Sequence, residues 1–386
     1  MGVIRAEPFR ASDWAARPAG AAWRMFDLQL TTYATLLVAV GLVMAYTNTI
    51  AAGSAALESG TTLSRGLLWA AIAAVAFLVG TAFDFRWLKT FAWLFYGIQL
   101  GLLVVTLLIG KGIGGSVRWV EIGPLTFQFS ELAKILMIVV LGSYLSSPGR
   151  NLNSLGSILG ACILAGPPLA LVLVQPDLGT SLVFGAILVG MLWISGASLR
   201  WLSVLGVAIL AMVPVAWTYL LRDYQKERLA SFLDASPDIQ GPGYQLYQAQ
   251  IAVTSGGWLG KGLTNGTQTQ GDLLPVQTTD FVFASLAEEL GFVGGAVLFV
   301  LFALLLWRVL LAGWRSQDPF GTLVAGGVAS MILFQLTVNV GMVLGVMPIT
   351  GIPLPFVTHG GASLVSLAAG LGILQSLNIR QTRAGW

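Results

Sequence analysis

Residues 278–312 read TTDFVFASLAEELGFVGGAVLFVLFALLLWRVLLA, and this stretch decides the fold class. From Phe281 onward it is apolar for longer than the about 20 residues that a helix needs to cross a hydrocarbon core. Asp280 stands where a long polar segment meets this apolar run. Burial at such a boundary disfavours the ionised carboxylate and raises its pKa toward the range useful to a general base. Asp280 is therefore the first candidate for a catalytic residue.

The composition indicates a membrane protein. Of the 386 residues, 56% are hydrophobic and only 10% are charged, and the mean hydropathy is +0.82. These polar side chains are too few to cover a soluble globule of this size. Ten stretches approach the length of a membrane span, which predicts an all-α polytopic membrane protein with ten transmembrane helices. The expected spans are 28–50, 66–83, 91–110, 129–146, 155–174, 178–196, 201–221, 281–312, 320–347 and 361–377.

The basic residues predict the orientation of the chain. With the N-terminus in the cytoplasm, twelve of the 20 Lys and Arg but only five of the 17 Asp and Glu fall on the cytoplasmic side. Lys and Arg are enriched in cytoplasmic loops, so both termini are expected there. The chain then divides into a cytoplasmic leader, 1–24, a membrane domain, 25–380, and a cytoplasmic tail, 381–386. The leader lacks the apolar core of a removable signal peptide.

A large outer loop, residues 222–279, separates the seventh and eighth expected spans. A connection of this length is normally functional or disordered. Its middle, GYQLYQAQIAV at 243–253, places apolar residues at helical spacing and predicts an amphipathic helix on the outer membrane surface. The Gly-, Thr- and Gln-rich stretch after it is expected to form a loop that returns the chain to Asp280.

A second group of candidate residues lies in KGIGGSVRWVEIGPLTFQFSELAK, residues 111–134. Arg118 and Trp119 lie in a glycine-rich outer loop, where a guanidinium can bind phosphate and an indole can stack on a sugar. The alternative that Trp119 only anchors the chain at the membrane interface is equally compatible with the sequence. Glu131 and Lys134 lie three residues apart and are expected to pair on one helix face, as a functional or a packing pair.

Two further polar residues are interpreted as structural. Asp177 precedes Leu178-Gly179-Thr180 and is expected to cap the helix that begins there. His359, the single histidine, cannot build a typical zinc site alone and is expected to be a turn residue.

Several motifs together resemble those of the SEDS family (shape, elongation, division and sporulation), in the same order over nearly the whole chain after residue 25. KGLTNGTQTQ is more similar to the RodA branch than to the FtsW branch. The motifs are RWVEIGPLTFQFSELAK, QPDLGTSL, YQKERLASFLD, GYQLYQAQIAVTSGGWLGKGL, GTQTQ, TTDFVFASLAEELGFVG and GIPLPFVTHGGAS.

The resemblance implies a ten-span peptidoglycan glycosyltransferase of the bacterial cytoplasmic membrane, active in cell wall biogenesis and cell shape. Such proteins polymerise lipid II at the outer face, in complex with a class B penicillin-binding protein that supplies the transpeptidase. The family's essential acid falls on Asp280. Its Arg-Trp pair falls on Arg118 and Trp119, and its Glu and Lys on Glu131 and Lys134.

The chain departs from the family pattern at several positions. Val276 and Thr278 replace the usual Glu and His before the essential acid, and Phe129 replaces a Pro. Thr358 and His359 replace the usual Ser-Tyr before two glycines. With Thr278 in place of the usual His, no imidazole at this position can orient the base or bind a metal.

Glycosyl transfer with inversion requires a base near the acceptor hydroxyl and positive charge near the departing pyrophosphate. We assign the base to Asp280, a sugar or prenyl-phosphate contact to Trp119, and binding of the diphosphate to cations. These cations are Arg118, Lys134 and either Arg228 or Lys261. No cluster of ligands in the sequence identifies a metal, and a divalent cation that shares the phosphate role stays an open alternative. The undecaprenyl tails are expected in grooves between spans.

Three other functions are also compatible with parts of the sequence. A transporter that flips lipid II would also combine many spans with intramembrane charges, although transporters tend to carry their charges at mid-bilayer within inverted repeats. An FtsW-like polymerase of division would share the chemistry. A non-catalytic scaffold of the cell-wall machinery would not need Asp280.

Overall fold

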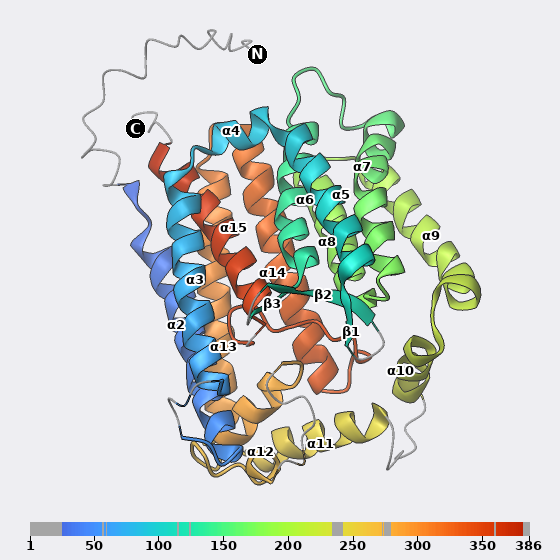
Figure 1. Cartoon of the computed structure of the whole chain (residues 1–386). Helices are drawn as coiled ribbons and strands as arrows, with labels where there is room; N and C mark the ends of the chain where they lie inside the picture. Colours follow the sequence, from blue (N-terminus) through green and yellow to red (C-terminus); the bar gives the residue numbers. More distant parts are fainter. Residues whose placement is uncertain are drawn as a thin grey trace.

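The computed structural model is a bundle of long helices (Figure 1). It describes residues 25–55, 58, 60–113, 116–122, 125–233, 242–271, 273, 279–358 and 360–380. The helices are α2 (Leu28–Ala51), α3 (Thr62–Ala82), α4 (Phe85–Thr90), α5 (Ala92–Ile109), α6 (Phe129–Leu145), α7 (Leu155–Val174), α8 (Leu178–Ile194), α9 (Leu199–Val215), the π-helix η3 (Ala216–Leu220), α10 (Asp223–Leu233), α11 (Pro242–Ser255), α12 (Thr267–Gln270), α13 (Val282–Trp314), α14 (Pro319–Val343) and α15 (Gly361–Arg380).

Every expected span coincides with a long helix of the bundle. Within the described residues, eight helices are long and apolar enough to cross a membrane. The helices at the other two expected spans, α6 and α8, are only 17 residues long. Apolar runs become helices because no water satisfies backbone N–H and C=O groups in hydrocarbon, so each group must bond within its own segment.

The core of the bundle is formed by α14 and α15, which are mostly buried. Small residues let α15 approach α3 closely. A Cβ added at Gly80 of α3 would lie 3.0 Å from the carbonyl oxygen of Ala369 and 3.2 Å from the Cα of Gly372. Backbone contact of this kind is the usual packing device of membrane helices.

Three aspartates cap helices and form ion pairs at the end of the bundle where α2 begins and α15 ends (Figure 1). Asp27, Asp84 and Asp318 each accept a hydrogen bond from the backbone at the start of a helix. Each also pairs with a cation of another element. Arg308 donates to Asp27 over 2.6 Å, Lys89 lies 3.2 Å from Asp318, and Arg380 lies 3.7 Å from Asp84. These contacts combine helix capping with ion pairing between helices.

The expectation of an all-α protein is wrong at residues 111–127. A three-stranded antiparallel sheet lies there, with strand order β1 (Lys111–Ile113), β2 (Ser116–Ile122) and β3 (Leu125–Phe127). Val120 of β2 is opposite Phe127 of β3. The stretch is rich in β-branched and aromatic residues between glycine-containing turn signals, which favours hairpins over the loop that we expected.

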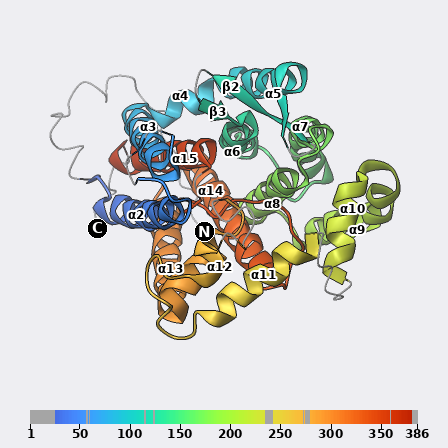
Figure 2. The same ribbon diagram turned by 60° about the horizontal axis from the view of Figure 1, so that its bottom comes forward.

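Three helices of segment 222–279, α10, α11 and α12, lie at the opposite end of the bundle from α4 (Figure 1). Helix α11 confirms the helix predicted at 243–253, and it runs across this end (Figure 2). Helices α9 and α10 lie at the margin of the bundle in both views. Helix α10 was not predicted, and the π-helix before it forms the end of the span expected at 201–221.

Candidate active site

Asp280 lies in a turn directly before α13, and hydrogen bonds fix its backbone. Asn339 of α14 donates from Nδ2 to the carbonyl oxygen of Asp280 over 3.0 Å and to that of Ile352 over 2.8 Å. Thr358 donates from Oγ1 to the carbonyl oxygen of Thr279 over 3.1 Å. The turn is therefore tied to α14 and to the segment between α14 and α15.

The Asp280 side chain lines a cavity of about 340 Å³. Arg118 and Trp119 reach this cavity from β2, and Glu131 reaches it from the first turn of α6. The remaining lining residues are Thr126, Gln128, Thr180, Thr279, Gly351, Pro353, Thr358, Gly360, Ala362 and Ser363. Four of the residues singled out in the sequence thus meet in one cavity, although they come from three separate segments of the chain.

Arg228 approaches the same place from α10. It lines a smaller cavity of about 80 Å³ together with Arg118 and Asp177. A Cβ added at Gly351 would lie 3.6 Å from Oδ2 of Asp280 and 3.9 Å from Nη1 of Arg228. Two guanidinium groups therefore flank the carboxylate, and the glycine leaves the space between Asp280 and Arg228 clear.

Opposing influences act on the pKa of Asp280. Desolvation by the surrounding protein is the largest and raises the pKa above its ordinary value. Arg118, Arg228 and a hydrogen bond from Thr279 lower the pKa, whereas the nearby carboxylate of Asp177 raises it. The net direction is upward, as the sequence predicted from burial.

The predicted pair of Glu131 and Lys134 is present and buried. Their side chains approach to 2.7 Å and are 4% and 2% exposed. Glu131 faces the cavity, and Lys134 lies one turn farther along α6. The ammonium group of Lys134 thus contacts the carboxylate that lines the cavity.

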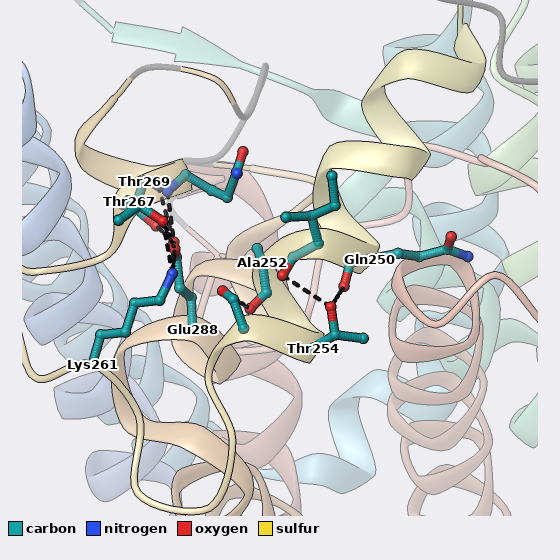
Figure 3. Close-up of polar contacts among 10 residues, drawn as sticks. Gln250, Ala252, Thr254, Lys261, Thr267, Thr269 and Glu288 are labelled. Carbon is teal, nitrogen blue, oxygen red and sulfur yellow. Dashed lines mark hydrogen bonds and ion pairs between the residues drawn. The ribbon is translucent and has the colours of Figure 1, made fainter.

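Lys261 lies elsewhere, in a polar cluster around the buried Glu288 of α13 (Figure 3). Nζ of Lys261 donates to Oε1 of Glu288 over 2.8 Å. Glu288 also accepts hydrogen bonds from the backbone N–H groups of Gln268 and Thr269. In the part of the chain that the structure describes, Lys261 lines neither of the two cavities that Arg118 lines. The structure therefore brings Arg228 to the site, and not Lys261.

The sequence reading missed the importance of several neighbours of the site. Asn339 carried no signal beyond being polar in an apolar run, which is itself an indication of function or of a satisfied backbone. Asp177 caps α8 as predicted, because its Oδ1 accepts from the N–H of Thr180 over 3.1 Å, but it also lies 3.4 Å from Nη1 of Arg118. Of the positions that depart from the SEDS pattern, Val276, Thr278 and His359 lie outside the described residues, and Phe129 begins α6.

An apolar groove of about 520 Å³ runs between α2, α3 and α15. A narrow cavity of about 20 Å³ separates it from the site. The narrow cavity shares Thr358 and Gly360 with the lining of the site, and Val38 and Leu42 with the lining of the groove. The site, the narrow cavity and the apolar groove thus adjoin one another in that order.

Among the described residues, no three His, Cys, Asp or Glu side chains are close enough together to hold a metal ion. Glu131 faces the cavity as well as Asp280, but the Glu131 carboxylate is neutralised by Lys134. The polar groups at the site thus fit a phosphate-containing ligand held by guanidinium groups.

The chain is similar to known proteins over most of its length. A family model described as "Cell cycle protein" (FtsW, RodA and SpoVE) matches residues 27–383. The peptidoglycan glycosyltransferase MrdB of Escherichia coli is 40% identical over 73% of this chain and 76% of its own length. The peptidoglycan glycosyltransferase RodA of Treponema pallidum is 31% identical over 92% of this chain and 98% of its own length.

Two solved structures share the fold. A chain of a peptidoglycan synthase complex that coordinates polymerization and crosslinking superposes with a TM-score of 0.78, at 31% identity, over 92% of this chain and 99% of that one. The rod shape determining protein RodA of Thermus thermophilus gives a TM-score of 0.67, at 28% identity, over 95% of this chain and 98% of that one.

Proposed function

Because the chain belongs to the FtsW, RodA and SpoVE family and is a peptidoglycan glycosyltransferase, we propose that it polymerises lipid II into glycan strands with Asp280 as the general base. The observation that carries this proposal is the shared cavity of about 340 Å³ in which Asp280 faces Arg118 and Trp119. Transfer from a sugar diphosphate requires a base and a cation, and an aromatic surface can bind the sugar ring.

In this mechanism Asp280 accepts the proton of the GlcNAc 4-hydroxyl as that oxygen attacks C1 of the MurNAc, and the undecaprenyl diphosphate leaves from the opposite face. The raised pKa of Asp280 suits this task, because a base works best when its pKa approaches the ambient pH. Negative charge develops on the departing diphosphate. Arg118 and Arg228 are close enough to Asp280 to stabilise that charge across one substrate.

The remaining candidates have supporting tasks. Trp119 offers an aromatic face to a sugar ring or to the prenyl phosphate at the cavity wall. The Glu131–Lys134 pair contributes a neutral, hydrogen-bonding wall. A divalent cation that binds the diphosphate of the substrate stays an untested alternative.

The apolar groove between α2, α3 and α15 supports a lipid-linked substrate. Its lining is almost wholly apolar, and only the narrow cavity lies between it and the cavity that contains Asp280. We therefore place the undecaprenyl chain of one substrate in this groove and its diphosphate at the guanidinium groups.

The site lies toward the end of the bundle that carries α11 and α12, away from the start of α2 and the end of α15 (Figure 1). With both termini in the cytoplasm, this end faces outward from the cytoplasmic membrane. Ten spans, with α6 and α8 counted among them, agree with that orientation. The partner that we propose is a class B penicillin-binding protein, in keeping with the similarity to a chain of a peptidoglycan synthase complex.

The reconstituted polymerisation reaction tests this function. Purified protein with its cognate penicillin-binding protein and labelled lipid II is expected to form glycan polymer. Asp280→Ala should abolish the polymer, whereas Asp223→Ala, at an acid whose side chain is 97% exposed on α10, should not. Polymer formation that survives Asp280→Ala would contradict the role of the base.

Two alternative functions, lipid II transport and polymerisation during division, can be distinguished by further experiments. Transport of labelled lipid II across vesicles without polymer would favour a flippase. The RodA and MrdB relatives support a role in cell elongation rather than division. FtsW and stage V sporulation relatives also match. Rescue of cells that lack their elongation polymerase, but not of cells that lack their division polymerase, would support elongation.

A further inference from the structure

Asp177 makes more contacts than a helix cap needs. Its Oδ1 accepts from the N–H of Thr180, and its Oδ2 accepts from Oγ1 of Thr180 over 2.8 Å. Gln128, at the start of α6, donates from Nε2 to the same Oδ2 over 2.8 Å. Oδ1 also faces Nη1 of Arg118 over 3.4 Å. One carboxylate thus joins β2, the start of α6 and the start of α8.

These contacts leave Asp177 unsuited to be a base itself. Its side chain is only 2% exposed, and both of its oxygens already accept hydrogen bonds or face the guanidinium. A carboxylate with several donors is fixed in one orientation, because each donor restricts its rotation. Asp280, which lines the larger cavity, is the acid that can reach a substrate there.

Arg118 is the group that this arrangement orients. Its side chain is 28% exposed and lines both the cavity that contains Asp280 and the smaller cavity that contains Arg228. Its Nε is buried and has no hydrogen-bond partner in the described residues. Arg118 thus faces Asp177 at Nη1, while the exposed part of its side chain lies where the linings of the two cavities meet and can donate to a ligand there.

We propose that Asp177 is a positioning residue for glycosyl transfer, which holds the Arg118 guanidinium between the two cavities and aimed at the substrate diphosphate. This inference rests on the proposed function. A guanidinium that is already oriented loses less side-chain freedom when it binds phosphate, and it stabilises the leaving group without reorganisation at the moment of reaction. Capping of α8 accounts for the hydrogen bond from the N–H of Thr180. The bonds from Oγ1 of Thr180 and from Gln128 fix the carboxylate that faces Arg118.

Asp177→Asn tests the proposal, because the amide keeps an oxygen for the N–H of Thr180 but loses the charge that holds Arg118. We expect kcat for lipid II polymerisation to fall about 100-fold, the scale of a misplaced catalytic group, with a smaller change in KM. Asp318→Asn is the matched control, since Asp318 also caps a helix and pairs with a cation, Lys89, at the other end of the bundle. It should leave kcat within about twofold of the wild type.

A double-mutant cycle separates positioning from general structure. If Asp177 acts through Arg118, Asp177→Asn should lower kcat little further in an Arg118→Gln background. A loss of kcat by the same factor in both backgrounds would overturn the proposal. The proposal would also be overturned if the loss of kcat in each variant matched its loss of folded protein in thermal melts.

If Asp177→Asn does not fold, Asp177→Ser replaces it, because serine is a preferred cap but is too short to reach Arg118. The kcat of Asp177→Ser should fall by the factor expected for Asp177→Asn, whereas the control Asp318→Ser should keep a normal kcat. A normal kcat for Asp177→Ser would overturn the proposal. The same experiment measures polymer formation by the wild type and by Asp280→Ala, which shows whether the activity depends on Asp280. Failure of that activity would count against the proposed function, whereas a normal Asp177→Asn would count against the positioning role alone.

Discussion

At the scale of single residues, the charge on Asp280 depends on neighbours that come from distant parts of the chain. Desolvation raises its pKa, and the two arginines that flank it lower the pKa again. A base is active only when ionised, so activity is lost as the pH falls through the pKa of Asp280. Since that pKa lies above the ordinary range of an aspartate, the acidic limb of the pH profile of kcat/KM should lie higher than an ordinary aspartate would give.

Removing one arginine should move this limb in a defined direction. Arg228→Gln deletes a charge that lowers the pKa of Asp280, so the pKa should rise and the acidic limb of kcat/KM should move to higher pH. Lys261→Gln is the control, because Lys261 pairs with Glu288 and not with Asp280. If Arg228→Gln leaves the acidic limb of kcat/KM unchanged, a group other than Asp280 is responsible for that limb.

Asn339 supports Asp280 through the backbone. Asn339→Leu removes both hydrogen bonds of Nδ2 and leaves the carbonyl oxygens of Asp280 and Ile352 without this donor. The free energy of unfolding should fall by about 1–3 kcal/mol for a buried group left unpaired, and polymerisation should fall with it. Thr337→Val, whose exposed hydroxyl bonds only its own helix, should change stability by less than about 0.5 kcal/mol in thermal melts. Equal stability of the two variants would contradict this role.

At the scale of elements, α13 is a helix interrupted at Gly291. Gly291 has φ 66° and ψ −163°, which breaks the 33-residue helix after its first nine residues. Backbone groups of 257–262 satisfy the groups that the break leaves unpaired. Lys261 N–H donates to the carbonyl oxygen of Glu288 over 3.0 Å, and Phe292 N–H donates to that of Gly257 over 2.9 Å. The break therefore ties the outer segment to the helix that begins beside Asp280.

Gly291→Ala tests the importance of the break. A side chain at this positive φ costs about 1–2 kcal/mol, and a Cβ would also overlap the backbone nitrogen of Gly260. The melting temperature should therefore drop clearly. Gly101→Ala in α5, where nothing lies within 4 Å of an added Cβ, should leave it unchanged or slightly higher. An unchanged melting temperature for Gly291→Ala would show that the chain does not need this conformation.

At the scale of the whole molecule, the undecaprenyl chain of a substrate is proposed to lie in the apolar groove between α2, α3 and α15. Ala74→Trp places a large ring in the groove, so KM for lipid II should rise several-fold while a short-chain analogue with the same head group is affected less. Ala71→Trp is the matched control, since Ala71 is also exposed on α3 but does not line the groove. Equal effects of both variants would argue against a lipid path here.

The sequence alone determined the membrane class, the positions of the long helices and the pairing of Glu131 with Lys134, and it pointed to Asp280 as the candidate base. These follow from local constraints, because an apolar run must satisfy its own backbone and residues three apart share a helix face. Only the tertiary structure decided that Arg228 flanks Asp280, that Lys261 pairs with Glu288 and that Asp177 holds Arg118. Such contacts join side chains from distant segments, and their pairing depends on how whole helices pack against one another, which no short pattern encodes.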